Sequence, residues 1–259
     1  MCKISDFMTL IDGIAPLPLS YKMIEKGSYD NSGLLVKMSD KADKILFTLD
    51  LSVNAVLYAI DNGFDTILTH HPAIYSPIKT ISIDTDKALA MAIKQGINII
   101  SMHLNLDVAE QGIDCSLCQG LGGIDMQVLD VIEGACGYGR KAKVKKQTLN
   151  EFAENIKGTF GSDKVIFYGD KPVENIVSFC GSGGSSAIEN LDKLDGVDTI
   201  ISSDFAHHQI KELIENDKNV VIIPHYVSEQ FGFYKFYELV KEKLDKKAQT
   251  FYFLDNRFM

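Results

Sequence analysis

The sequence predicts an α/β protein whose parallel-rich mixed sheets are flanked by helices. Short apolar runs, each long enough for one buried strand, alternate with segments that have helical periodicity. The runs are continuously apolar, which is typical of strands covered on both faces, as in parallel sheets. No linker rich in Pro, Ser or Gly and no low-complexity tract divides the 259 residues. The chain is long enough for one large or two ordinary domains.

The apolar runs predict buried strands. In chain order they are Ile45–Leu49, Thr66–Thr69, Ile97–Met102, Val165–Tyr168, Ile176–Cys180, Thr199–Ser202 and Val220–Ile223. Helical patterns lie between them or follow them, at Thr85–Gln95, Asn150–Ile156, Ala206–Ile214 and Glu229–Leu244.

The stretch 126–145 has a different pattern. It combines extended residues, a GACGYGR turn and the alternating segment KAKVKK, which together predict a hairpin or an edge strand. We take it as the seam between two linked α/β halves. One half is expected to comprise residues 1–125 plus 220–259, and the other residues 126–219.

The composition limits the partners and the compartment. The chain has 26 Lys and Arg against 35 Asp and Glu, a net charge of −9, so a nucleic-acid partner held by bulk positive charge is not expected. Asp6 and Asp12 interrupt the N-terminal segment, which therefore does not resemble a signal peptide. Apolar runs of about five or six residues fall well short of the ~20 needed to cross a bilayer. With an odd, low count of five cysteines, the sequence predicts a reduced, cytoplasmic protein without a membrane partner.

The first candidate site is Thr69-His70-His71-Pro72, directly after a predicted strand. Successive side chains of an extended chain point to opposite sides, but a bend favoured by Pro72 could aim both imidazoles at one point or at neighbouring points. Imidazole is a common ligand of zinc, iron and related ions. The alternative is a polar turn with exposed histidines.

The second and third candidates also follow predicted strands. His103 and Asp107 are four residues apart, as are His225 and Glu229, so each pair shares one face if its segment is helical. The structural alternatives are helix capping by Asn105 or Asp107 and a Ser228 cap that places Glu229 in a first helical turn. These alternatives are individually plausible but jointly improbable, because three strands each end in a histidine with a second ligating group nearby.

Other motifs carry weaker signals. His207 and His208 follow another strand and could line the same cleft or form an exposed first helical turn. The glycine-rich segment 181–186 could hold an anion on its backbone N–H groups or simply make a tight turn. Cys115 and Cys118 have CxxC spacing without a second ligand pair, which favours buried structural thiols.

Together these motifs resemble the dinuclear metal-binding family named after yeast NGG-one-interacting factor three, whose bacterial members are often called GTP cyclohydrolase I type 2 homologues. The resemblance covers essentially the whole chain. It rests on the ordered segments YDNSGL (29–34), LTHHP (68–72), MHLNLD (102–107), CGSGGSS (180–186), SDFAHHQIKE (203–212) and PHYVSE (224–229). Tyr29 stands where the family usually has Trp, and Pro224 where it usually has Gly; neither change removes a ligand.

The resemblance implies two divalent metal ions per chain (Zn, Fe, Mn or Co), with ligands at His70, His71, Asp107, His225 and Glu229, the set that the spacing also selects. His103 would be a nearby site residue; it, Asp107 or Glu229 could move a proton. The implied fold is two α/β halves in a toroidal homohexamer.

Two functions remain open from the sequence. The first is a metal-dependent hydrolase acting on a small molecule, for which the resemblance suggests GTP and opening of its purine imidazole ring by metal-activated water. The alternative is a non-catalytic metal-binding or regulatory ring protein.

Overall fold

The computed structural model describes residues 2–259, which fall into two compact units. Unit 1 comprises the chain up to Ala109 together with Phe233–Arg257, and unit 2 comprises Glu110–Gly232 with the last two residues. The junctions between the units differ from those expected from the sequence, which were 125/126 and 219/220. The first lies earlier because the helix that begins at Ile113 packs against strands of unit 2, and the second lies inside a continuous helix.

Unit 1 contains a five-stranded mixed sheet with the order β1-β4-β3-β2-β11. Strands β4, β3, β2 and β11 are parallel, and β1 is an antiparallel edge strand. Its elements are α1 (Ile4–Asp12), α2 (Leu17–Glu25), β1 (Gly33–Val36), β2 (Lys44–Thr48), α3 (Val53–Asp61), β3 (Thr66–Thr69), α4 (Lys87–Lys94), β4 (Asn98–Ser101), α5 (Leu104–Val108) and β11 (Gln249–Tyr252). A short 3-10 helix, η2 (Asn256–Phe258), follows β11.

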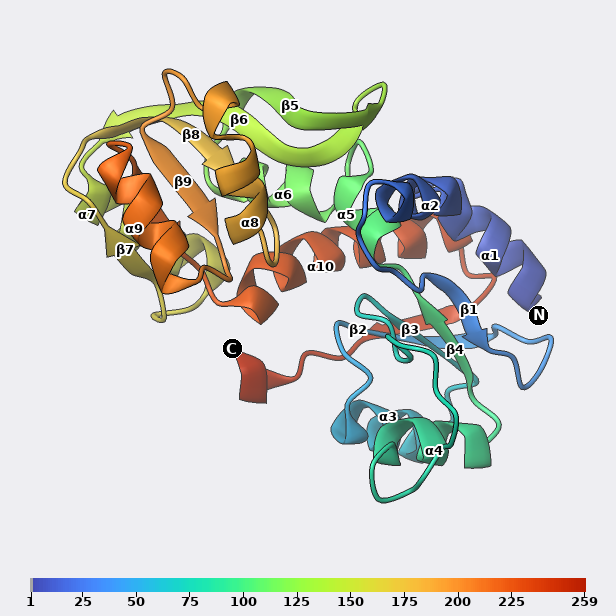
Figure 1. The fold of residues 1–259 in the computed structure, drawn as a ribbon. Coiled ribbons are helices and arrows are strands. Elements are labelled where there is room, and N and C mark those ends of the chain that lie inside the picture. The colour runs from blue at the N-terminus through green and yellow to red at the C-terminus, as the bar shows by residue number, and fades with distance from the viewer. Residues whose placement is uncertain (1) are drawn as a thin grey trace. The chain divides into compact units, whose positions relative to one another are not determined.

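Helices cover both faces of the unit 1 sheet (Figure 1). Leu46 points to the face covered by α3 and α4, where it joins a buried cluster with Val56 and Leu89. Its neighbour Phe47 points to the opposite face, because strand side chains alternate. There its ring contacts Phe7 of α1 and, at 6.4 Å between centroids, Phe233 of α10 (His225–Leu244).

Unit 2 contains a six-stranded sheet with the order β5-β6-β8-β9-β10-β7. Strands β8, β9 and β10 are parallel, whereas β5, β6 and β7 pair antiparallel. The elements are α6 (Ile113–Gly120), β5 (Ile124–Glu133), β6 (Cys136–Gln147), α7 (Leu149–Phe160), β7 (Ile166–Tyr168), β8 (Val173–Ser178), α8 (Gly184–Glu189), η1 (Leu191–Lys193), β9 (Thr199–Ser202), α9 (His207–Glu215), β10 (Asn219–Ile222) and the start of α10.

The unit 2 sheet is also enclosed by helices. Ala187 of α8 and Leu213 of α9 pack with Val177 and Ile200 in a buried cluster on one face. Helix α6 packs against β6 and β8, and α7 packs against α6 and β7. Figure 1 shows α8 and α9 lying across the sheet beside β8 and β9.

The predicted fold class is confirmed: the chain is an α/β protein with two mixed sheets flanked by helices. The segment 126–145 is the predicted hairpin, since β5 and β6 pair antiparallel and β5 is an edge strand. Strands β1 and β11 were not predicted. Both are edge strands whose side chains are mostly half-buried or exposed, unlike those of the fully buried strands that the apolar runs predict.

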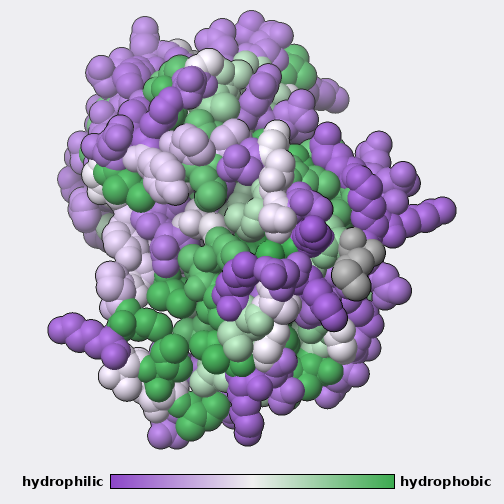
Figure 2. Space-filling model, turned by 90° about the vertical axis from the view of Figure 1, so that its right-hand side faces the viewer, coloured by the Kyte–Doolittle hydropathy of each residue, from purple (hydrophilic) through white to green (hydrophobic). Residues whose placement is uncertain are grey.

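The surface carries the many charged side chains that the composition predicts. Hydrophilic side chains dominate the face drawn in Figure 2, with hydrophobic side chains reaching the surface between them. Among the described residues, no helix is both long enough and apolar enough to span a membrane.

Cys115 and Cys118 are buried, and burial raises the pKa of the Cys118 thiol to about 12, so the structural interpretation of the CxxC segment is confirmed.

These thiols give a test of the fold. Cys136 is half-buried and the other cysteines are buried, so a thiol-specific reagent at pH 8 is expected to label Cys136 first. Cys118 should react only after unfolding, because burial disfavours its thiolate. Mass spectrometry of native and denatured protein measures this order, with Cys136→Ser as the control that should lose the fast label. Rapid labelling of Cys118 in native protein would contradict the packing of α6.

Candidate metal centre

In unit 1, sheet register brings two histidine-bearing strand ends together. Thr69 at the end of β3 pairs with Ser101 at the end of β4, and their hydroxyl oxygens lie 2.7 Å apart. Parallel strands end at the same edge, so the residues that follow, His70 and His103, lie close to each other. Their ring centroids are 5.3 Å apart.

His70 is fully buried and its ring orientation is fixed by the backbone. Its Nδ1 lies 2.8 Å from the carbonyl oxygen of Met102. A carbonyl can only accept, so Nδ1 carries a hydrogen, and the neutral form of the ring has its lone pair at Nε2. That Nε2 lies 3.4 Å from Oδ1 of Asp107, which also offers lone pairs. Two acceptors facing each other in a buried place fit a shared cation.

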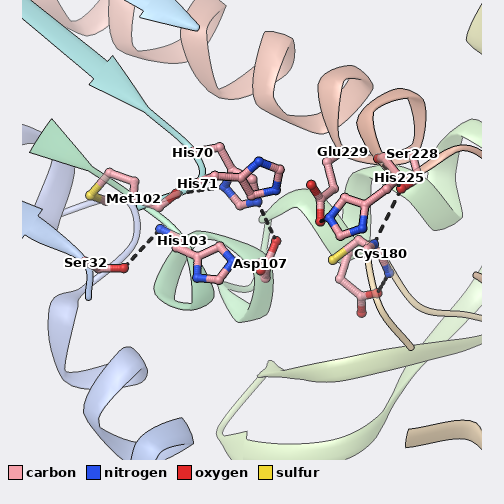
Figure 3. A network of polar contacts seen from close by, with 12 residues as sticks. Ser32, His70, His71, Met102, His103, Asp107, Cys180, His225, Ser228 and Glu229 are labelled. Carbon is pink, nitrogen blue, oxygen red and sulfur yellow. Dashed lines mark hydrogen bonds and ion pairs between the residues drawn. The ribbon is translucent and has the colours of Figure 1, made fainter. Parts of the chain in front are cut away.

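His71 and His103 have the same arrangement, with carboxylates in place of the carbonyl. His71 Nδ1 donates to Asp50 Oδ1 at 2.7 Å, and His103 Nδ1 donates to Asp30 Oδ1 at 2.8 Å. Ligating atoms of these two rings and of His70 lie within 4.8 Å of one another. Figure 3 shows the three rings gathered beside Asp107.

Asp30 is the most buried of these supporting carboxylates. Burial by itself raises the pKa of Asp30, but hydrogen bonds from His103, Ser20 and Ser32 outweigh it and hold that pKa below its ordinary value. Ser32 Oγ donates to the carboxylate at 2.7 Å and also accepts the backbone N–H of His103 at 3.0 Å. The ring of His103 is therefore fixed at both its backbone and its side chain.

In unit 2, the ends of β8, β9 and β10 form a second cluster by the same rule. His225 follows β10 and Asp204 follows β9, and the two strands pair in parallel up to Ile222 and Ser202. His225 Nδ1 donates to Asp204 Oδ2 at 2.7 Å, and its Nε2 lies 3.1 Å from Oε1 of Glu229. Glu229 is only 3% exposed.

Helix α10 begins at His225, earlier than predicted. The structural alternative of a Ser228 cap is therefore wrong: Ser228 lies within the helix, where its hydroxyl donates to the carbonyl of His225 at 2.9 Å. The longer helix makes the four-residue spacing of His225 and Glu229 helical, which aims both side chains to one side (Figure 3).

The turn after β8 presses against this pair. Gly181 has a positive φ of 58°, and a Cβ built there would lie 2.3 Å from Glu229 Oε1 and 3.3 Å from His225 Nε2. The turn is held by buried Asp114, whose Oδ1 accepts the backbone N–H of Cys180 at 3.0 Å. Close approach to a carboxylate explains why a glycine occupies this position.

The structure also places the other residues that the sequence singles out. Residues Leu104–Val108 form α5 with His103 at its N-cap position, so the alternative of a cap by Asn105 or Asp107 is wrong. The side chain of Asn105 instead donates to the carbonyl of Ala15 at 2.7 Å. His207 and His208 are exposed in the first turn of α9, which confirms the helical alternative for them.

Three carboxylates that hold the histidine rings are not among the site residues that the sequence predicts: Asp30, Asp50 and Asp204. Asp50 follows β2 and Asp204 follows β9, so the strand-end rule could have found both. Asp30 precedes β1 in an irregular segment, and no spacing rule connects it with His103, 73 residues later. Only the folded chain joins them.

The unit 1 cluster fits a divalent metal ion, because its three histidines place ligating atoms within 4.8 Å of one another. All four rings anchor Nδ1 on an acceptor and present Nε2, which is the usual arrangement of histidine ligands and their supporting groups. Nitrogen and carboxylate donors without thiolate suit Zn, Fe, Mn or Co. Histidine and carboxylate clusters at the ends of parallel strands thus define an α/β protein with candidate metal sites.

Comparison with known proteins identifies the family. Residues 2–257 match Duf34/NIF3 (NGG1p interacting factor 3), and the chain belongs to that family. A Clostridium perfringens relative called "GTP cyclohydrolase 1 type 2 homolog" is 31% identical over 254 residues, which is 95% of this chain and 94% of the relative. "Protein NIF3 homolog" from Schizosaccharomyces pombe is 27% identical over 76% of each chain.

Solved structures agree on the fold. A Staphylococcus aureus hypothetical protein superimposes with a TM-score of 0.86 at 24% identity, over 98% of this chain and 97% of that one. A Bacillus cereus protein related to NIF3 gives the same TM-score at 18% identity, with coverage of 99% and 98%. At these identities the likeness establishes the fold alone.

The supporting carboxylates can be tested separately from the ligands. Asp204→Asn is expected to weaken metal binding by about 10- to 100-fold, because an amide holds the Nδ1–H of His225 less strongly and lowers the basicity of Nε2. Competition with a chelating dye measures the affinity. The exposed Asp192→Asn in the same unit is the matched control and should bind as the wild type does. Equal affinity for both variants would remove Asp204 from the site.

Gly181 provides a steric test. Gly181→Ala is expected to displace Glu229 and to destabilise the protein by about 1–2 kcal/mol, because φ is positive and the new methyl group overlaps Oε1. Thermal unfolding measures the stability and metal titration the loss of binding. Gly196→Ala is the control for backbone strain, since its φ is also positive but its Cβ would meet open space. A metal affinity lost equally in both variants would contradict the steric explanation.

Proposed function

We propose that the chain is a dinuclear metal-dependent hydrolase, in which His70, His71, Asp107, His225 and Glu229 hold two divalent ions. The observation that carries the proposal is the orientation of the rings: each histidine of the set anchors Nδ1 and presents Nε2 toward other ligating groups. A backbone carbonyl holds His70, whereas the carboxylates of Asp50 and Asp204 hold His71 and His225. The expected ligand set therefore rests on supporting contacts as well as on spacing.

In the proposed reaction, side chains of the chain would balance the charge of the metal ions and move the proton. Bound divalent ions would supply Lewis acidity, which lowers the pKa of water toward neutrality. Asp107 and Glu229 would balance the positive charge and could accept a proton. His103 presents Nε2 beside His70 and His71, and Asp30 holds its Nδ1, so it is the third candidate for proton transfer.

For the reaction, we propose opening of the purine imidazole ring of GTP, in line with the name carried by the Clostridium perfringens relative. We also propose self-association into a homohexamer in the cytoplasm. The second candidate function is a non-catalytic metal-binding or regulatory ring protein, which the same metal clusters would equally serve.

Metal content tests the centre first. The purified protein loaded with Zn, Fe, Mn or Co is expected to hold two ions per chain, and His71→Ala or Glu229→Ala should lower this number while circular dichroism stays unchanged. Elemental analysis after gel filtration gives the stoichiometry. His208→Ala, an exposed histidine of α9, is the control that should keep full occupancy. Unchanged stoichiometry in both ligand variants would overturn the site.

Turnover then separates the two functions. Metal-loaded protein incubated with GTP is expected to release the ring-opened product, detected by loss of purine absorbance and by mass spectrometry. The Glu229→Ala protein is the background. A fully loaded protein that leaves GTP and other nucleotides intact would reject the cyclohydrolase and favour the metal-binding ring protein.

A further inference from the structure

We propose that Tyr29 and Tyr75 form a binding platform for a planar aromatic ring beside His103, so that the substrate of the proposed hydrolase is recognised by stacking. This inference rests on the proposed function for its catalytic meaning, but the binding platform is a feature of unit 1 alone. Both residues are exposed, with exposed fractions of 44% for Tyr29 and 52% for Tyr75.

The two rings form one contiguous surface that adjoins the histidine cluster. Their centroids lie 4.9 Å apart with an interplanar angle of 56°. Tyr75 also lies edge-on to His103, at 6.5 Å between centroids and 77° between planes. A ligand stacked on this pair would therefore have its ring next to Nε2-presenting imidazoles.

The backbone that carries the platform is fixed, although its rings are exposed. Asn31 Nδ2 donates to the carbonyl of Ile74 at 2.6 Å, which ties the segment of Tyr29 to that of Tyr75. Asp30, between Tyr29 and Asn31, binds His103, Ser20 and Ser32. Holding exposed aromatic rings in place before a ligand arrives reduces the entropy lost on binding.

Stacking fits this surface better than hydrogen-bonded readout does. Aromatic rings present apolar faces that a planar heterocycle covers, and such stacking contributes substantially for every base type. Purine bases are the planar rings that the proposed reaction would require. The competing occupant is a second copy of this chain. The segment between β3 and α4, which contains Tyr75, also exposes Ile78, Ile81 and Ile83.

The test uses the fluorescent nucleoside 2-aminopurine riboside as the aromatic probe and ribose 5-phosphate as the non-aromatic one. Wild-type protein, both metal-free and metal-loaded, is expected to quench the nucleoside on binding, as stacked bases are quenched. Changing both tyrosines to Leu (Tyr29→Leu with Tyr75→Leu) should weaken nucleoside binding by about tenfold or more. Affinity for ribose 5-phosphate should not change.

Two controls isolate the aromatic face. Changing both tyrosines to Phe should keep nucleoside binding near the wild-type level, and Tyr21→Leu, at another exposed tyrosine of unit 1, should leave it unchanged. Metal content is measured on every variant, because failure of the metal centre would reject the hydrolase and leave nucleoside binding to the metal-free protein intact.

Three outcomes would overturn the platform. They are absence of nucleoside binding to the wild type, equal affinity in the Leu variant, and a lower oligomeric mass of the Leu variant in analytical ultracentrifugation. The last would assign the tyrosines to a contact between copies of the chain.

Discussion

The hydrogen bond that holds Nδ1 of each site histidine is the interaction on which the rest of the candidate centre depends. A carbonyl behind His70 and carboxylates behind His71, His103 and His225 fix which nitrogen carries the hydrogen and where the other one points. Without these acceptors an imidazole could rotate or change tautomer, and a histidine-rich edge would be only a polar surface.

Parallel register places those acceptors. Strands that end level deliver the residues after them to one edge, so Asp204 and His225 meet after β9 and β10 in the same way as His70 and His103 meet after β3 and β4. In both units, parallel strands thus bring polar residues of the candidate site together at one edge of the sheet. Helix α10 brings His225 and Glu229 together in a different way, because residues four apart on a helix lie on the same face.

Close packing around the clusters limits which residues can support them. Gly181 leaves room for the carboxylate of Glu229, and buried Asp114 holds the turn in which that glycine lies. Around His103, Asp30 is surrounded by three hydrogen-bond donors that outweigh the cost of its burial. Such pre-arranged groups are typical of sites that must bind a charged species without reorganising.

The sequence by itself determined the fold class and, through spacing alone, the candidate ligands, because apolar periodicity and residues at strand ends are local signals. It also indicated the β5–β6 hairpin from its turn and alternation. Only the tertiary structure decided which groups stand behind each histidine, since Asp30 and His103 lie 73 residues apart and Asp50 and His71 lie 21 apart. It also decided that α10 begins at His225, because strong capping residues such as Ser228 can sit inside a helix when their hydroxyls bond to the preceding turn.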